Sequence, residues 1–270
     1  MTVKRQRSRE RLAKLRGDRE KLTSHLIENS ALPSPHANIE LAQAFGDVFE
    51  SPPPDAAERA MIDEWLALTL DEAPVNTKKE FLVACAAVAL GTIYLQSSEE
   101  EAEPVFEKMR AASRDARWRT REAACFAFQR VGEHNFDQLR SMFEWWMERA
   151  NMADRRAILV SLAHPPFLTS DDRVEFCLEV AGRTLADLEK LTSAGRKTEE
   201  YKILEKGLKF APSVYVAASP EIGFRWLSRV ASTENMENKK IIAANIRKSR
   251  LAKKHPEKCM EIGEVLASGF

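Results

Sequence analysis

A repeated pair of amphipathic segments within residues 104–162 limits the fold of this 270-residue chain more than any other feature. In each pair an apolar segment of helical period is followed by a turn near an aspartate, Asp115 or Asp154, and then by a second helical segment. Arg121 and Arg156 occupy matching positions in the two second segments, 35 residues apart. A period of this length, built only from helices, is typical of an α-solenoid, in which each helix pair buries its apolar face against its neighbours.

The composition also favours an all-α fold. The chain has only 10 glycines, few alternating β-branched runs and many residues with high helix propensity. Residues 81–90 are apolar on nearly all sides of a helix, which predicts a buried helix. We therefore expect an all-α fold, an α-solenoid of about six helix pairs, over residues 31–270. Residues 1–30 are expected to form a basic helical cap or arm.

Several functional classes are disfavoured by the sequence. The most apolar stretch, residues 81–95, contains Gly91 and is shorter than the run of about 18 apolar residues that a membrane span needs. The four cysteines are widely spaced without a CxxC pair, which favours reduced thiols over disulfides or a zinc site. The five histidines lack ligand spacing, and no glycine-rich phosphate loop occurs. We expect a cytoplasmic protein with no metal, no cofactor and no membrane partner.

The charges of the chain balance in number but are unevenly distributed. There are 41 basic and 41 acidic residues, which weighs against a protein that coats nucleic acid indiscriminately. Residues 4–21 contain nine Lys or Arg against three acids, and residues 239–258 contain eight against one. A net charge of zero is therefore compatible with one strongly basic face.

The basic position of the repeat continues along the chain. Lys206 and Lys240 align with Arg121 and Arg156, and the two lysines are 34 residues apart. An α-solenoid places equivalent side chains along one concave surface, so these four residues are expected to form a basic strip. The sequence leaves two uses open, since such cations serve either a polar ladder between repeats, with aspartates such as Asp115, or contacts with phosphates.

The C-terminal basic run has two interpretations as well. On a helix, residues such as Arg247 and Lys248 spread over much of the circumference, so part of the run faces solvent in any case. A solvated face is one interpretation, and attachment to a phosphate backbone is the other.

Three passages give the chain a resemblance to a known family. They are RWRTREAA (117–124), ERANMADRRAILVSL (148–162) and EEYKILEKGLKFAPSVYVAASP (199–220). Between about residues 106 and 256 the chain resembles the DNA alkylation repair proteins built of HEAT-like repeats, the alkylpurine DNA glycosylases. The resemblance implies a HEAT-like solenoid that binds double-stranded DNA and excises N3- or N7-alkylated purines without a cofactor.

The same resemblance implies roles for individual residues. Trp118 and Phe210 would be aromatic contacts for the alkylated base, and Glu122 the carboxylate that supports cleavage; the family typically has Trp in place of Phe210 and Asp in place of Glu122. Phosphate contacts would come from the basic residues Arg121, Arg156, Lys206, Lys240, Arg247 and Lys248.

Interpretations from the residues alone remain beside this one. Trp118 at a junction between a turn and a helix is often a packing residue, and Glu122 can be a solvated helix charge. A non-catalytic scaffold is also compatible with the pattern, because a cationic groove suits a protein partner with an acidic segment.

Overall fold

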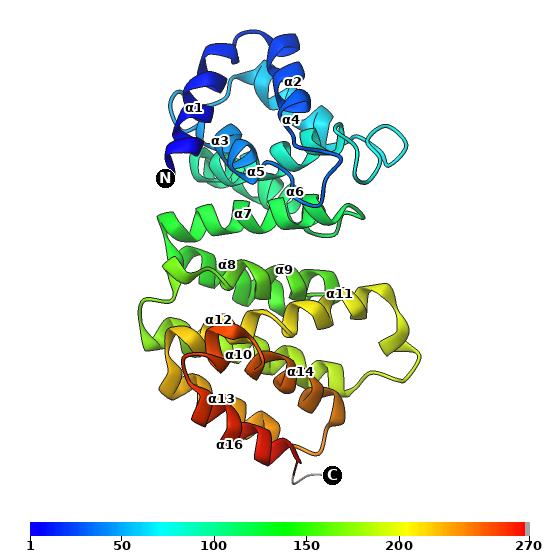
Figure 1. Ribbon diagram of the computed structural model, residues 1–270. Coiled ribbons are helices and arrows are strands. Elements are labelled where there is room, and N and C mark those ends of the chain that lie inside the picture. The colour runs from blue at the N-terminus through cyan, green and yellow to red at the C-terminus, as the bar shows by residue number, and fades with distance from the viewer. Residues whose placement is uncertain (268–270) are drawn as a thin grey trace. The chain divides into compact units, whose positions relative to one another are not determined.

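The protein is all-helical. The computed structural model describes residues 1–267, and over that range it contains α-helices and short 3₁₀ turns without a β-strand, which confirms the predicted all-α class. The chain divides into two compact units, Met1–Ser141 and Met142–Phe270, and helix α8 (Phe136–Met147) runs across the division. Figure 1 labels the helices in chain order.

The first unit is built around one nearly fully buried helix. Its helices are α1 (Val3–Leu15), α2 (Arg19–Glu28), α3 (Ile39–Asp47), α4 (Ala56–Leu66), α5 (Glu80–Gln96), α6 (Glu99–Ser113) and α7 (Trp118–His134). Every residue of α5 from Glu80 to Ile93 is buried, because α2, α3, α4, α6 and α7 all pack around it. This confirms the buried helix predicted from the apolar run.

Close approach of α5 and α7 depends on a glycine. A Cβ atom at Gly91 would lie 2.5 Å from the carbonyl oxygen of Ala127 and 2.8 Å from its Cα. Because both are backbone atoms, neither moves without displacing α7, and only glycine fits there.

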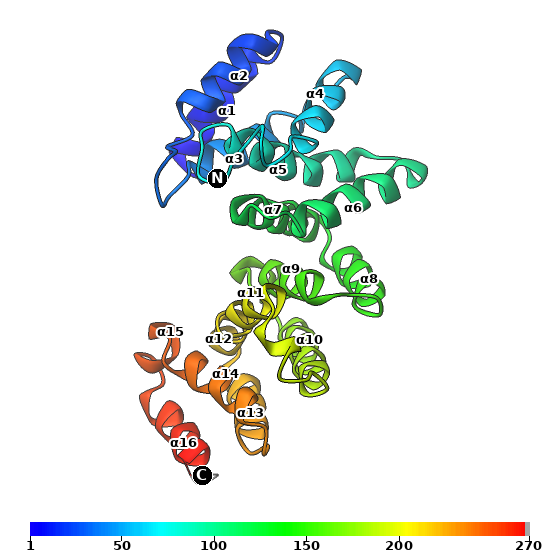
Figure 2. The ribbon, with the colours of Figure 1, turned by 90° about the vertical axis from the view of Figure 1, so that its right-hand side faces the viewer.

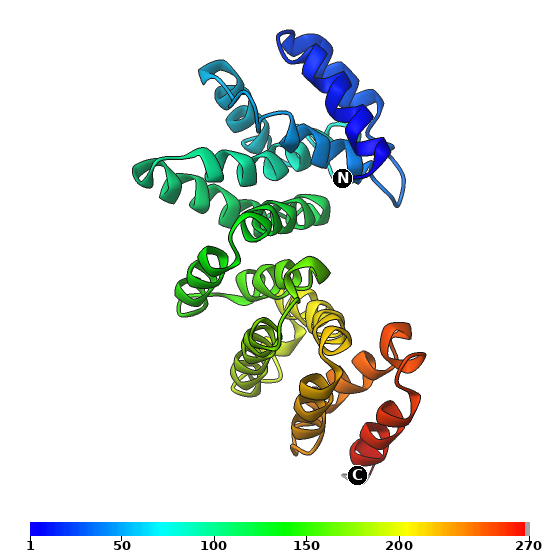
Figure 3. The same ribbon diagram turned by 90° about the vertical axis from the view of Figure 1, so that its left-hand side faces the viewer.

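The N-terminal helices belong to the first unit and are fixed by ion pairs. Helices α1 and α2 form a hairpin, and α1 packs on α3 (Figure 3). Asp47, at the end of α3 and 2% exposed, accepts hydrogen bonds from Arg5 Nε and Nη2, each at 2.6 Å, and also pairs with Arg130 of α7. Arg16 reaches Glu58 of α4, with Nε 2.5 Å from Oε1.

The second unit surrounds a short apolar helix. It contains α9 (Met152–Leu162), α10 (Asp171–Glu189), α11 (Glu199–Leu208), α12 (Ala211–Ala218), α13 (Pro220–Ala231), α14 (Met236–Ile246), α15 (Ser249–Ala252) and α16 (Pro256–Ala267), with 3₁₀ turns η1 (Pro165–Phe167) and η2 (Gly195–Lys197). Residues Ala211 to Val216 of α12 are all buried, because helices α9, α10, α11, α13, α14 and α15 contact this segment. The Tyr215 hydroxyl donates to the Leu159 carbonyl oxygen at 2.6 Å.

Within the second unit, α10 and α13 pack side by side. Figure 2 shows this pair along one side of the unit, with α15 on the other side. The unit therefore presents different helices on these two sides.

Helix ends follow local capping chemistry. Capping boxes begin α4 (Asp55 with Glu58), α6 (Ser98 with Glu101) and α9. The box at Ser98 starts α6 so early that Pro104 lies inside the helix.

Candidate nucleic-acid interface

Trp118 is a surface residue, and the guanidinium of an arginine lies over its indole ring. It begins α7 and is 44% exposed, so it does not serve as a core residue. The guanidinium carbon of Arg119 lies 4.4 Å from the centroid of the Trp118 ring. One face of the indole is therefore in contact with a cation of the protein itself.

The position of Arg119 is set by buried polar partners. Its Nη1 donates to Glu80 Oε2 at 3.1 Å, and its Nη2 donates to the Ser34 carbonyl at 2.6 Å and to Asn76 Oδ1 at 3.1 Å. Arg119 is 6% exposed and Glu80 is fully buried. This buried network fixes the guanidinium and, through it, the orientation of the Trp118 indole.

Glu122 and Phe210 are accessible, but they belong to different units. Glu122 is half-buried on α7, one helical turn after Trp118. Phe210 precedes α12 in the second unit and is 36% exposed, with the Arg250 guanidinium carbon 5.0 Å from its ring centroid. Trp118 and Glu122 share a helix as expected, whereas the joint action of Trp118 and Phe210 on one base stays a prediction.

The first two members of the basic strip make contacts within the protein. Arg121 Nη1 donates to the carbonyl oxygens of Asp115 at 2.6 Å and Ala116 at 2.9 Å, which ties down the turn before α7. Arg156 is 8% exposed on α9, and its Cγ would lie 3.3 Å from a Cβ added at Gly207 of α11. Arg121 therefore supports the turn before its own helix, and Arg156 packs against α11.

The other two members of the strip face solvent. Lys206 on α11 and Lys240 on α14 are exposed, and Lys240 Nζ lies 2.9 Å from Oε1 of Glu237 on its own helix. Arg156 and Lys206 lie on neighbouring helices, because α9 packs on α11. Lys240 is thus exposed to solvent, and its charge is partly neutralised by Glu237.

A dense set of cations lies between the end of α14 and the start of α16. This C-terminal basic surface consists of Arg247, Lys248, Arg250, Lys253 and Lys254. Arg247, Lys253 and Lys254 are exposed and the other two are half-buried. Within the described part of the chain, none of the five forms an ion pair with a carboxylate, so their charges remain available to an anionic partner.

Helix α1 lies in the N-terminal segment that the sequence marked as basic, and it carries a second set of cations along one face. Lys4, Arg7, Arg11 and Lys14 are exposed, and none of them forms an ion pair among residues 1–267. Their spacing of three, four and three residues places them on one face of α1. The opposite face carries Arg5, which pairs with Asp47. The helical spacing of these four cations is a sequence signal that could have predicted this cationic face of α1.

Residues 1–267 contain free thiols and no arrangement suited to a metal. Cys85, Cys125 and Cys177 are buried and Cys259 is half-buried, each as a free thiol, and burial raises the pKa of Cys85 well above its ordinary value. No group of three or more His, Cys, Asp or Glu side chains in this range is placed to hold a metal ion. The same residues include no helix with the length and hydropathy required to cross a membrane.

Comparisons of the chain with protein-family models, with curated proteins and with solved structures found no match.

Proposed function

We propose that the protein is a HEAT-like α-solenoid that binds double-stranded DNA, with the C-terminal basic surface making the main contacts to the phosphate backbone. The observation that carries this proposal is the absence of carboxylate partners for the five cations of that surface within the described residues. Several arginines of the first unit are instead engaged by acids, as Arg5, Arg16 and Arg130 are. When cations without carboxylate partners contact phosphates, they displace the counterions condensed on the DNA, and this release favours binding.

The charge of the second unit supports the same proposal. It has 21 Lys and Arg against 18 Asp and Glu, a net charge of +3, whereas the first unit has 20 against 23. Phe210 adds an exposed aromatic ring beside the basic surface, in contact with Arg250 of that surface. An aromatic ring next to cations suits a nucleotide, because bases stack on the ring while the cations contact the backbone.

The test compares two doubly neutralised variants. Arg247→Gln/Lys248→Gln removes two members of the basic surface, and Lys78→Gln/Lys197→Gln removes two exposed lysines elsewhere. Fluorescence anisotropy of a labelled 20-base-pair duplex is followed between 50 and 300 mM NaCl. We expect the first variant to lower the steepness of the plot of log affinity against log salt by about 1.8, which is 0.9 per lost phosphate contact. Equal slopes for the two variants would overturn the assignment.

We further propose that the DNA-bound protein excises N3- or N7-alkylated purines. Alkylation makes the base a good leaving group, so the glycosidic bond breaks as water adds at C1′ of the sugar. Glu122 would stabilise the positive charge developing on the sugar and orient the water. Trp118 would contact the cationic base with the part of its surface that Arg119 leaves open. The exposure of Trp118, one turn from Glu122 on α7, supports this role.

Base release tests this second step directly. The protein is incubated with methylated duplex, and free 7-methylguanine is measured by chromatography. We expect release by the wild type and its loss in Glu122→Gln and Trp118→Ala, both at exposed or half-buried positions that preserve folding. Undiminished release by both variants would refute the site assignment. Absence of release by the wild type would refute excision and limit the proposed function to DNA binding.

A scaffold for a protein partner is the second candidate function. An apolar groove of about 470 Å³ lies between α14 and α16 and includes Met236, Ile246 and Leu266, with Lys240 and Arg247 among its lining residues. Apolar side chains beside cations suit an amphipathic segment with acidic residues. A chain that binds no duplex at 50 mM NaCl would favour this candidate.

A further inference from the structure

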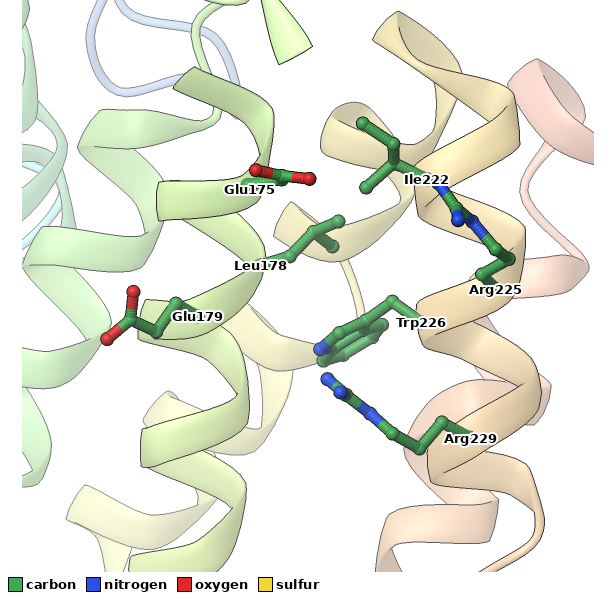
Figure 4. A pocket seen from close by; sticks show the side chains of 7 residues that line it. All are labelled: Glu175, Leu178, Glu179, Ile222, Arg225, Trp226 and Arg229. Atoms are coloured by element: carbon green, nitrogen blue, oxygen red, sulfur yellow. The ribbon is translucent and has the colours of Figure 1, made fainter. Parts of the chain in front are cut away.

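Helices α10 and α13 lie on the side of the second unit away from α15 (Figure 2), and a groove runs between them. It has a volume of about 530 Å³. One wall is formed by Glu175, Leu178 and Glu179 of α10, and the other by Ile222, Arg225, Trp226 and Arg229 of α13 (Figure 4). We call this feature the α10–α13 groove.

The two walls of the α10–α13 groove carry opposite charges. Glu175 and Glu179 are exposed on α10, and Arg225 and Arg229 are exposed on α13. Among the residues that the structure describes, none of these four side chains forms an ion pair. Arg183, one turn beyond Glu179 on α10, does pair with Glu148, at 2.5 Å. The groove therefore presents one acidic and one basic wall whose charges are not neutralised within the protein.

The basic wall also contains a buried hydrogen-bond donor without an acceptor. Trp226 is 5% exposed, and its Nε1 has no hydrogen-bond partner. The indole lies against α10 at Gly182, where an added Cβ would be 3.6 Å from Nε1. Figure 4 shows the indole nitrogen directed toward α10, with the Arg229 guanidinium beside it.

Such a donor costs free energy unless it finds an acceptor. Because the nitrogen is buried, an incoming carboxylate reaches the exposed Arg229 guanidinium beside it rather than the N–H.

We propose that the α10–α13 groove is the docking site of a second copy of this chain. A two-fold axis parallel to the groove places the acidic wall of each copy over the basic wall of the other. The carboxylates of Glu175 and Glu179 then face the exposed guanidinium groups of the other copy's basic wall across the interface. Every contact occurs twice, as in any isologous dimer. The net charge of zero means that two copies do not repel one another as a whole.

The dimer is expected to be weak and sensitive to salt. Leu178 and Trp226 are already buried within the unit, so charge pairs rather than new apolar burial provide most of the attraction. Exposed ion pairs are screened by salt over a length of about 8 Å at physiological ionic strength. Dimerisation is therefore sought at low salt and high protein concentration.

Charge-reversal variants of the whole chain test this proposal. Glu175→Lys/Glu179→Lys makes both walls basic, and Arg225→Glu/Arg229→Glu makes both acidic; all four positions are exposed, so folding is retained. Sedimentation equilibrium is run from 1 to 200 μM protein in 50 mM NaCl. We expect the wild type to shift from 30.6 kDa toward twice that mass, and each variant alone to stay monomeric. An equimolar mixture of the two variants should regain the dimer, since their walls are again complementary.

A charge control outside the groove completes the test. Lys197→Glu, on an exposed lysine outside the groove, should dimerise as the wild type does. A wild type that stays monomeric at 200 μM, reversal variants that dimerise alone, or a mixture that fails to associate would each overturn the proposal.

Discussion

Asp47 is the point at which three helices of the first unit are joined, and its replacement gives the sharpest test of this packing. The side chain is 2% exposed and binds Arg5 of α1 through two hydrogen bonds of 2.6 Å. It also pairs with Arg130 of α7. Asp47→Asn preserves the size of the side chain and one carbonyl oxygen, but it removes the charge and leaves two guanidinium groups facing a neutral amide.

The expected cost follows from the burial of the carboxylate. Removing one partner of a buried ion pair costs about 3–5 kcal/mol. Arg5 and Arg130 keep side-chain exposures of 24% and 11%, so water compensates part of the loss. We expect the free energy of unfolding to fall by about 3 kcal/mol, which lowers the melting temperature of a unit of this size by about 6–12 °C.

The assay is urea and thermal unfolding of the whole chain, followed by circular dichroism. Glu50→Gln is the matched control, because Glu50 also pairs with Arg130, at 2.9 Å, but is 46% exposed. The control should lose less than about 1 kcal/mol, as exposed ion pairs contribute little. If Asp47→Asn matches the control, the reasoning from burial is refuted.

The same residue gives stability a defined dependence on pH. Burial alone would raise the pKa of Asp47, but hydrogen bonds and charges from Arg5 and Arg130 hold that pKa below its ordinary value. A lowered pKa in the folded state stabilises the protein above the ordinary pKa, and this contribution is lost as the pH falls through the folded-state pKa. The stability difference between wild type and Asp47→Asn should therefore shrink as the solution is acidified below the ordinary aspartate range.

Two further predictions concern packing. Gly91→Ala should destabilise the protein by about 2 kcal/mol or more in urea unfolding, because the new Cβ meets the backbone of Ala127. The control Gly17→Ala should be neutral or stabilising, because no atom lies within 4 Å of its new Cβ. Similar stabilities of the two variants would contradict the contact. Tyr215→Phe should cost about 1–2 kcal/mol in the same assay, since it removes a buried hydrogen bond of 2.6 Å to Leu159, and an unchanged stability would speak against that bond.

Much of the helical architecture was predictable from local sequence. The run at residues 81–90 identified α5 as a buried helix because its apolar side chains surround the helix axis, and Glu80 to Ile93 are indeed all buried. The turn at Asp115 was also predictable, and the structure shows its carboxylate accepting a hydrogen bond from the Arg117 backbone at 2.7 Å. Such features depend on period and capping, which a sequence records directly.

The use of individual charges was not predictable in the same way. Arg121 matched Arg156 in the repeat, yet its guanidinium caps the Asp115 and Ala116 carbonyls. Helical spacing places Arg5 and Arg7 on different faces of α1, yet it does not show that Arg5 meets a buried carboxylate, Asp47, which is 42 residues away in the chain. The partners of long side chains depend on tertiary packing, so the sequence could list the cations but could not identify their partners.

The salt dependence of duplex binding by the whole chain tests the central claim most directly. If the five cations of the C-terminal basic surface each contact a phosphate, a plot of log affinity against log salt should have a slope near −4.5, from about −0.9 per contact. A slope near zero, or no measurable binding to duplex at 50 mM NaCl, would contradict the claim that this surface binds the DNA backbone.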